Sequence, residues 1–481
     1  MDSLFQDFAQ ANNTLNGYLL ATTISPVPPH SDPARLYNFS RSANSYSIQT
    51  DLRYKLQYNP DIQLDRKEAN AWLEVYTAFY SFVGTLLAAE ETQNAGRARE
   101  ADWARVYDGW KEVVNALLKG YQSSMFAVWT IPCLYTAGRY LRVFAIKADE
   151  SIASQRDSGL AFGGIQEEDA FNPDSKHEKL EDAARQINRI FALCTSDRAP
   201  LEQSRKWALY YTATLLFKTY FKLNSISLCK VILRSLRAAA DSDMPPLAAF
   251  PKAHQVSFKY YSAVIHFLEE DYVTAEALLT DAWEQCLRTT NGASKNLELI
   301  LTYLIPTRLL TAHKLPSKAL LAPYPRLAAL FDPITSSIRA ADLTAFNAAM
   351  EAGEEEFVKR RIYLTLERGR DIILRNVFRK VFIAGGFEGA KEANGGDGTP
   401  TAASGSATPL VRRTRVPVNE FAAALQLAGA EVGDGEGGVD GDEVECLIAN
   451  AMYKNLMKGY IARERGIVVL SKAGAFPGTG V

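Results

Sequence analysis

The sequence predicts a mainly α protein, in which a solenoid of paired helices leads into a small helix-and-hairpin module at the C-terminal end. Three observations predict this fold class. Apolar residues recur at three- and four-residue steps through most of the 481 residues, as they do in amphipathic helices. From residue 201 these segments come in pairs of similar length joined by short links. We expect no strand before residue 460, after which two extended runs flank an Arg-Gly turn, a pattern typical of a β-hairpin.

Residues 1–200 are predicted to form an N-terminal helical region. The Pro-rich stretch at residues 25–33 ends its first helix, and residues 151–175 break the helical pattern and are predicted to be a mobile loop. The amphipathic segments of this region are residues 1–20, 64–90, 100–121, 123–147 and 176–194.

Residues 201–384 are predicted to form a helical-repeat domain. The link Leu-Glu-Glu-Asp-Tyr at residues 268–272 resembles a tetratricopeptide-type turn, after which Ala275 and Ala277 would let the second helix pack closely on the first. No strict period is present, so the repeats are degenerate, and each pair is expected to need its neighbours to complete the core. Pro306 falls within a helical pattern, and we expect it to bend that helix.

Residues 385–410 are rich in Gly, Ala, Ser and Thr and are predicted to be a flexible insert. A second Gly-rich and acidic stretch occupies residues 429–443. These stretches flank a short helix, predicted from Val418, Phe421, Leu425 and Leu427.

Residues 411–481 are predicted to form a winged helix. A helix over residues 442–458 carries Val444, Leu447, Ile448, Ala451 and Met452 on one face, and a hairpin over residues 460–464 and 467–471 follows. Such a module can hold nucleic acid or dock a matching module. The alternative interpretation is a helix and hairpin that cap a larger core.

Composition narrows the class of protein. The net charge is −2, so any affinity for nucleic acid must come from local patches. No apolar run reaches the roughly 18 residues that span a membrane, and the N-terminal segment is acidic where a signal peptide would be basic. The five Cys form no CxxC pair, which is typical of a reducing compartment. We therefore expect a soluble intracellular protein without a membrane partner.

The motifs of common enzymes are missing from the sequence. The Gly-rich segment at residues 385–396 lacks the Gly-Lys-Ser/Thr ending of a phosphate-binding loop, and neither HExxH nor GxSxG occurs. His254 and His266 lack metal-ligand spacing. We therefore expect no enzyme activity, no cofactor and no metal.

Positive charge is concentrated near the C-terminal end. Residues 359–380 hold eight Lys and Arg, and Arg361, Arg368 and Arg375 repeat every seven residues. A single helix would place these three arginines on one face, where they could pair within the domain. Basic groups of this kind bind phosphates by releasing counterions, although any single charge can simply be a solvated side chain. The candidate nucleic-acid-binding residues are Lys359, Arg360, Arg412, Arg413, Arg415, Lys454, Lys458, Arg463, Arg465 and Lys472.

The predicted helix over residues 442–458 begins with Asp442, Glu443 and Glu445. Acidic residues at this end argue against reading of a DNA major groove and favour binding of RNA or single-stranded DNA through its backbone. Simple compensation of the helix dipole also explains the acidic start and basic end of this helix.

Aromatic residues at helical spacing between residues 210 and 261 are expected to pack in the core rather than to stack on bases. The same helices carry several cations, which could instead receive an acidic peptide. The candidate residues for this contact are Lys218, Lys222, Lys230 and Arg234.

Several ordered blocks of the sequence resemble the PCI-domain family. They include YYTATLLFKTYFKLNSISLCKVILRSL, PPLAAFPKAHQVSFKYYSAVIHFLEEDYVTAEALL, KNLELILTYLIPTRLL and EVECLIANAMYKNLMKGYIARERGIVVLSK. The most similar branch is that of the COP-nine signalosome subunit-twelve-like proteins, which is related to the PCI subunit of the nuclear transcription-and-export complex. The resemblance covers roughly residues 200–384 and 411–477, and the Gly-rich inserts depart from it.

The resemblance implies a non-catalytic scaffold subunit. It implies that a second PCI-domain subunit binds the winged helix, for which the candidate residues are Tyr460, Ile467 and Val469. A small, acidic, disordered Dss-type polypeptide would bind the helical repeats. The assembled complex would bind RNA or single-stranded DNA and act in transcription elongation, splicing or messenger RNA export. We therefore expect a nuclear location, with a cytoplasmic one left open. The alternative is a protein-only scaffold of a signalosome- or proteasome-lid-like assembly.

Overall fold

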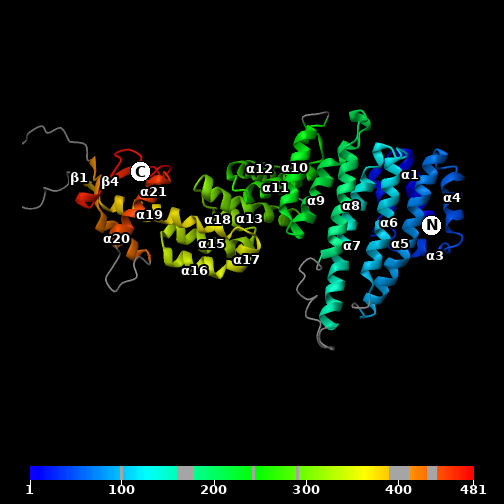
Figure 1. Ribbon diagram of the computed structural model, residues 1–481, viewed down its shortest axis with the longest axis horizontal. Coiled ribbons are helices and arrows are strands. Elements are labelled where there is room, and N and C mark those ends of the chain that lie inside the picture. Colours follow the sequence, from blue (N-terminus) through cyan, green and yellow to red (C-terminus); the bar gives the residue numbers. More distant parts are fainter. Residues whose placement is uncertain (98–100, 160–176, 241–243, 289–291, 389–410, 431–440) are drawn as a thin grey trace, which may run out of the picture. The chain divides into compact units, whose positions relative to one another are not determined.

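The computed structural model describes residues 1–97, 101–159, 177–240, 244–288, 292–388, 411–430 and 441–481 (Figure 1). The chain forms two compact units, Met1–Ile265 and His266–Val481. The sequence-based boundary at residues 200/201 divides the chain elsewhere, within the first unit. Helices dominate both units, as predicted.

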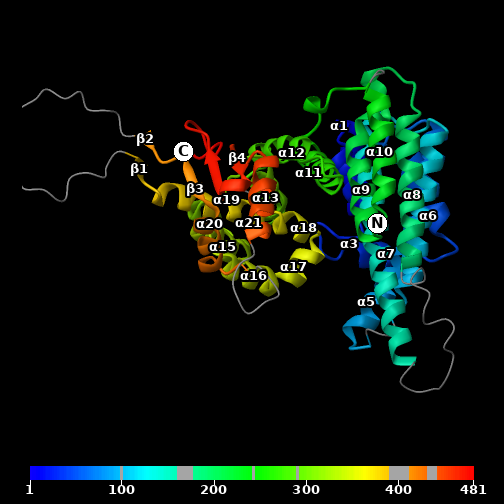
Figure 2. The same cartoon turned by 60° about the vertical axis from the view of Figure 1, so that its left-hand side comes forward.

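The first unit is a layer of helices packed in chain order. Its long helices α5 to α8 lie side by side, each against the next (Figures 1 and 2). Their shared core is strongly aromatic, and Trp72, Tyr76 and Trp110 are almost completely buried in it. The helices are α1 (Asp2–Thr14), α2 (Gly17–Thr23), α3 (Arg35–Arg41), α4 (Ile48–Gln57), α5 (Arg66–Asn94), α6 (Trp103–Gln122), α7 (Pro132–Gly159), α8 (Glu178–Thr195), α9 (Leu209–Lys222), α10 (Ile226–Ala240) and α11 (Lys252–Leu268), whose last three residues belong to the second unit.

The N-terminal elements correct several predictions. Residues 1–20 do not form one helix: Leu15 adopts a left-handed conformation with φ of 53°, and the Asn16 side chain accepts a hydrogen bond from the Leu19 N–H to start α2. Helices α3 and α4 were not predicted. The predicted loop at residues 151–175 begins too early, because α7 continues to Gly159; residues 160–175 lie outside the described part. Helix α7 also starts later than predicted, at Pro132, where proline suits a first helical position.

The second unit continues with helices and ends in strands. Its elements are α12 (Tyr272–Gln285), α13 (Ala293–Thr311), α14 (Lys318–Leu321), α15 (Pro325–Ala340), α16 (Leu343–Ala352), α17 (Glu354–Lys359), α18 (Tyr363–Glu367), α19 (Gly369–Ala384), β1 (Phe387–Glu388), β2 (Val411–Arg412), β3 (Arg415–Pro417), α20 (Val418–Leu427), α21 (Gly441–Tyr453), β4 (Gly459–Ala462) and β5 (Ile467–Leu470).

Helices α12 and α13 pack as a pair, as do α15 and α16, in agreement with a solenoid of helical repeats. Asp271 caps the start of α12 by accepting a hydrogen bond from the Thr274 N–H. Ala275 is fully buried, as expected of a close-packed position, whereas Ala277 is exposed. Pro306 lies inside α13.

The basic segment at residues 359–380 is not one helix. It comprises the end of α17, the short α18 and most of α19, because Arg361 adopts a left-handed conformation with φ of 60°. Arg361, Arg368 and Arg375 therefore do not share the face of one helix. Arg368 does pair within the domain, with Glu270 at 2.9 Å, but Arg375 forms no such pair among the described residues.

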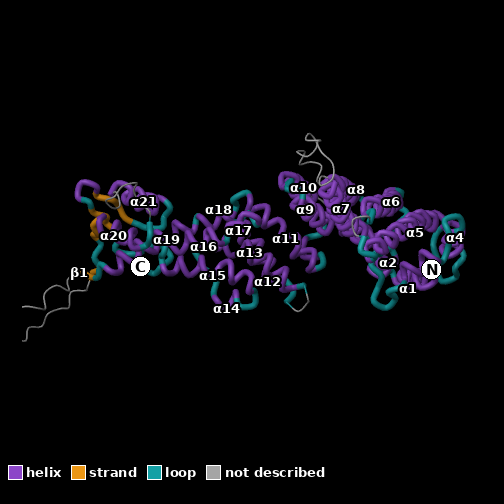
Figure 3. The backbone as a smooth tube through the Cα atoms, turned by 90° about the horizontal axis from the view of Figure 1, so that it is seen from below, coloured by secondary structure: helices purple, strands orange, loops and turns teal. Residues whose placement is uncertain are grey.

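The winged helix consists of α20, α21 and an antiparallel sheet with strand order β3-β5-β4. Figure 3 shows the strands gathered beside α20 and α21. Val416, Val468 and Leu470 are buried, because alternation along β3 and β5 turns them to the inner face of the sheet. The hairpin prediction is confirmed: β4 and β5 pair, and Gly466 takes a left-handed conformation at their connection.

Three details of this module differ from prediction. Strand β3 precedes residue 460, where no strand was expected. Helix α21 ends at Tyr453, since Asn455 adopts a left-handed conformation with φ of 55°, so Lys454 and Lys458 lie beyond it. Leu427 is 91% exposed, so only part of the predicted apolar stripe of α20 is buried. The predicted flexible insert lies mostly outside the described residues, which include its two-residue flanking strands β1 and β2.

Candidate partner and nucleic-acid interfaces

The outer face of the winged-helix sheet presents a row of side chains that no described element covers. The register places Arg415, Val469 and Tyr460 directly across the three strands. Because side chains alternate between faces, all three lie opposite to the buried Val468. Tyr460 is 62% exposed, and Ile467 and Val469 are half-buried. The strand register thus brings the three predicted partner-binding residues together on one face.

One end of this sheet carries three exposed cations: Arg415, Lys458 and Lys472. Backbone hydrogen bonds bring the three chain segments that carry these cations next to one another. The Leu470 N–H donates to the Thr414 carbonyl at 2.8 Å, and the Ser471 N–H donates to the Lys458 carbonyl at 2.9 Å. None of the three cations has an ion-pair partner in the described parts of the chain. We refer to Arg415, Lys458 and Lys472 as the basic end of the sheet.

Most other predicted nucleic-acid residues of the winged helix are engaged within the protein. Arg413 pairs with Glu420 at 3.0 Å, and Lys454 pairs with Asp371 at 2.7 Å. Arg463 pairs with Asp442 at 2.7 Å, and Arg412 lies over the rings of Phe382 and Phe387. Arg465 is exposed, but it lies at the hairpin connection, the opposite end of the sheet from Lys472.

Lys359 and Arg360 do not join this group, because they lie at the end of α17, which packs against α16 and α18. Arg360 is an internal residue of the solenoid. Its guanidinium donates to Glu356 at 2.6 Å and to the Thr302 hydroxyl at 3.0 Å. Lys359 is exposed. The sequence grouped these two residues with the winged-helix cations, but the structure separates them.

The four residues predicted to contact an acidic peptide, all in the first unit, differ in their exposure to solvent. Lys218 is half-buried, and its carbonyl accepts a hydrogen bond from Arg142 of α7 at 3.3 Å. Burial lowers the pKa of Lys218, and the charges of Arg142 and Arg139 lower it further. Sequence reasoning missed both arginines. Lys222 and Arg234 are exposed and Lys230 is half-buried, on α9 and α10.

The expected core role of the aromatic residues on α9 is confirmed for most of them. Tyr210, Phe217 and Tyr220 are buried, and Phe217 stacks near Phe258 with ring centroids 6.2 Å apart. His254 packs against the rings of Tyr135 and Tyr211, and burial lowers its pKa.

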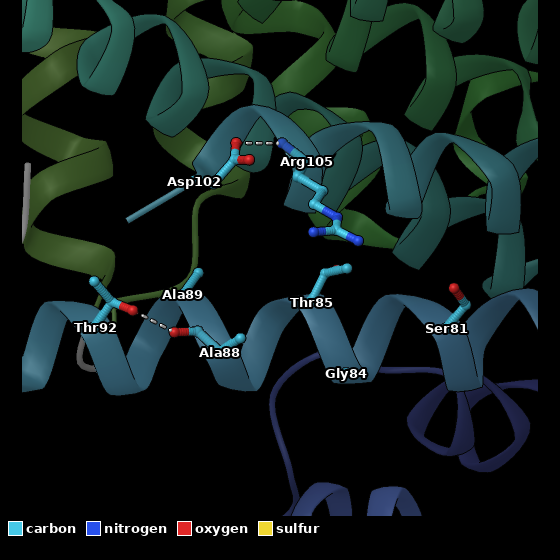
Figure 4. A pocket seen from close by; sticks show the side chains of 8 residues that line it. All are labelled: Ser81, Gly84, Thr85, Ala88, Ala89, Thr92, Asp102 and Arg105. Carbon is cyan, nitrogen blue, oxygen red and sulfur yellow. Dashed lines mark hydrogen bonds between the residues drawn. The ribbon is translucent and has the colours of Figure 1, made fainter. Parts of the chain in front are cut away.

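A pocket of about 420 Å³ lies between α5 and α6 (Figure 4). Small residues such as Gly84 and Ala88 form one wall, and Asp102 and Arg105 form the other. Asp102 already accepts a hydrogen bond from the Arg105 backbone N–H at 2.9 Å. Among the described residues that line the pocket, Asp102 carries the one carboxylate, and no second group suited to acid–base chemistry lies beside it.

The cysteines are unpaired, and all except Cys446 are buried. Burial raises the pKa values of Cys194 and Cys229 to about 12, so these thiols stay protonated at neutral pH. Within the described residues, no group of three or more His, Cys, Asp or Glu is arranged to hold a metal ion. Nor does any described helix combine the length and apolar character needed to cross a membrane.

A helical-repeat solenoid that leads into a winged helix defines the class of PCI-domain proteins. The family model described as PCI domain matches residues 401–472. Over their full lengths, the chain is 51% identical to proteins named Protein CSN12 homolog from Gibberella zeae and from Neurospora crassa. It is 29% identical to PCI domain-containing protein 2 of Xenopus laevis, over 79% of this chain and 81% of that protein. The chain therefore belongs to the PCI-domain family of scaffold proteins, in the branch of the CSN12 homologs.

Proposed function

We propose that this protein is a non-catalytic subunit of a nuclear complex in messenger RNA biogenesis. It docks a second PCI-domain subunit on the outer face of its winged-helix sheet, and it binds RNA or single-stranded DNA next to that subunit. The observation that carries the proposal is the row of Arg415, Val469 and Tyr460 across the outer face of the sheet. An apolar and aromatic centre with a charged rim has the composition of a protein interface.

The basic end of the sheet supports the nucleic-acid part of the proposal. Arg415, Lys458 and Lys472 are exposed, close together, and not neutralised by described carboxylates. Three such cations add a local excess of charge to a chain whose net charge is −2. A second subunit docked on the outer face could extend this patch, so that a strand of nucleic acid contacts both subunits.

The cluster of Lys218, Arg142 and Arg139 supports binding of a small acidic polypeptide of the Dss type to the first unit. Burial and mutual repulsion lower the pKa of Lys218, so the arrangement is electrostatically unfavourable by itself. An acidic segment laid along α7 and α9 would supply the missing negative charge.

A protein-only scaffold of a signalosome- or lid-like assembly is the second candidate. The observation that favours it is the internal pairing of Arg360, Arg413, Lys454 and Arg463 with carboxylates. These pairs leave a smaller free basic surface than the sequence suggests.

Purification of the tagged protein from nuclear extract, with mass spectrometry of what remains bound, separates the two candidates. The main proposal predicts one other PCI-domain subunit and one small acidic polypeptide. Recovery of a signalosome-like core would favour the second candidate.

The assembled complex would then be titrated with a labelled single-stranded oligouridylate at several salt concentrations. Reversal of Arg415, Lys458 and Lys472 to Glu should weaken binding. It should also make the slope of log Kobs against log salt less steep by about 2, because a single strand contributes about 0.7 per phosphate contact. Lys359→Glu reverses one exposed cation on α17; it is the control for each single reversal at the basic end, and it should leave binding unchanged. An unaltered affinity in the triple variant would contradict the assignment of the basic end.

A further inference from the structure

A two-stranded ribbon adjoins the winged-helix sheet at its basic end (Figure 2). Strands β1 and β2 are antiparallel, and Phe387 lies directly opposite Arg412. Directly opposed residues of such a ribbon carry their side chains on the same face. The guanidinium of Arg412 accordingly lies over the Phe387 ring, 5.0 Å from its centroid. Phe387 is still 49% exposed, and none of the other described rings or cations covers it.

Contacts with the core hold Arg412 in this position. Its guanidinium also lies over the ring of Phe382, 5.4 Å from the centroid. Phe382 is only 2% exposed and packs against Phe476. The Nη1 atom of Arg412 is buried and has no hydrogen-bond acceptor among the described residues, and no described carboxylate pairs with this arginine. Arg412 is therefore a fixed, positively charged support for the exposed ring of Phe387.

The backbone places this ring close to the basic end of the sheet. The Arg413 N–H donates to the Gly386 carbonyl at 3.1 Å, which continues the pairing of the ribbon toward β3. Arg415, the first residue of β3, follows Arg412 by three positions. An extended chain rises about 3.3 Å per residue, so the Cα atoms of these two arginines are separated by at most about 10 Å. The Phe387 ring thus lies within the reach of a strand bound at the basic end.

Exposed aromatic rings beside a group of cations form a typical surface for single-stranded nucleic acid. The cations contact the phosphates, and the rings stack on bases, since every base has a flat π face. Bases in a duplex are paired and stacked on their neighbours, so a protein ring reaches their faces only in a single strand or after unpairing. The position of Phe387 beside the basic end therefore favours a single strand over a duplex.

We propose that Phe387, supported by Arg412, stacks on a base of a single-stranded nucleic acid whose phosphates contact the basic end of the sheet. This site rests on the proposed function and adds to it a contact with a base. Because stacking needs only a flat ring, we expect little preference among the bases at this position.

The test uses the assembled complex and two labelled strands of equal length, an oligouridylate and a strand made of abasic sites. Phe387→Ala should weaken binding of the oligouridylate by about fivefold or more, the usual effect of losing one base–aromatic contact. It should leave binding of the abasic strand unchanged, because that strand keeps its phosphates. Phe387→Tyr retains the ring and should bind both strands as the wild type does. Leu427→Ala, which shortens an exposed apolar side chain on α20, is the control and should also bind normally.

A fluorescent adenine analogue within the strand gives a second measurement, made first on the wild type. Stacking lowers its emission, so the emission should fall when the wild-type complex binds and should not fall with Phe387→Ala. Stacking by Phe387 is ruled out if the wild-type complex binds the oligouridylate and Phe387→Ala binds it equally well. It is also ruled out if Phe387→Ala weakens binding of both strands equally, since the ring would then act on the backbone or on a docked subunit. Failure of the wild-type complex to bind either strand would contradict the proposed function, and the stacking contact with it.

Discussion

Single residues show how closely the first unit is packed. Gly120 of α6 lies against the ring of Phe126, and a Cβ atom at this position would approach that ring to 2.1 Å. Phe126 in turn packs on Trp72, with centroids 4.2 Å apart. The ring therefore has little freedom to move away. By contrast, a Cβ atom at Gly84 of α5 would meet nothing within 4 Å.

These two helix glycines give a matched pair of predictions. Gly120→Ala should lower the free energy of unfolding by about 1–3 kcal/mol, because it overpacks the core. Gly84→Ala should raise it by about 0.5–1 kcal/mol, because alanine is the better helix former and the site is open. Urea unfolding of both variants measures the difference. Equal effects of the two substitutions would contradict the packing described around Phe126.

Asp197 anchors the loop between α8 and α9. Its side chain is only 3% exposed. It accepts hydrogen bonds from the Arg205 backbone N–H at 2.6 Å and from Arg205 Nη2 at 3.1 Å, and Arg205 Nη1 donates to the Tyr121 carbonyl at 2.6 Å. Burial by itself raises the pKa of Asp197, but the hydrogen bonds and the charge of Arg205 outweigh it and lower the pKa.

This lowered pKa makes the loop sensitive to acid. The stabilisation by Asp197 is fully present above the pKa of an unfolded aspartate, about 3.9. It is lost as the pH falls through the lower folded value. Asp197→Asn should therefore lower the free energy of unfolding by about 2–3 kcal/mol at pH 7. The difference in this free energy between the variant and the wild type should become smaller below about pH 4. Denaturant unfolding over this pH range measures the difference in the free energy of unfolding between the variant and the wild type. Asp61→Asn is the control, because Asp61 is exposed. A difference that is constant with pH would contradict the role of the carboxylate.

At the scale of elements, helix periodicity was enough to predict most of the long helices, because the pattern is local to each segment. It failed for α3 and α4, which are short and follow a Pro-rich stretch. It also failed for β3, which has three residues and is defined by pairing with β5, about fifty residues later in the chain. Strands β4 and β5 pair with each other and are joined by the turn at Gly466, so the local sequence was enough to predict them.

Tertiary contacts also limit what the sequence shows of the candidate site. A count of basic residues does not reveal that Arg463 pairs with Asp442 or Lys454 with Asp371. The grouping of Arg415 with Lys458 and Lys472 arises from strand register.

At the scale of the whole molecule, the proposed function gives separate tasks to separate surfaces. In the proposed function, the outer face of the winged-helix sheet would bind a second PCI-domain subunit, and the basic end beside it would bind nucleic acid. The cluster around Lys218 would bind an acidic polypeptide. A scaffold of this kind works through the partners that it holds together, so the docking contact is the central claim.

The most direct test of that claim compares Tyr460→Asp with Tyr453→Asp. Both tyrosines are exposed, at 62% and 90% respectively, but only Tyr460 lies on the outer face of the sheet. Retention of the second PCI-domain subunit by the tagged protein would be measured by quantitative mass spectrometry over a dilution series. Loss of a central aromatic anchor costs about 2 kcal/mol or more, roughly thirtyfold in affinity. We predict that loss for Tyr460→Asp and near-normal retention for Tyr453→Asp; equal retention by both variants would contradict docking on the outer face of the sheet.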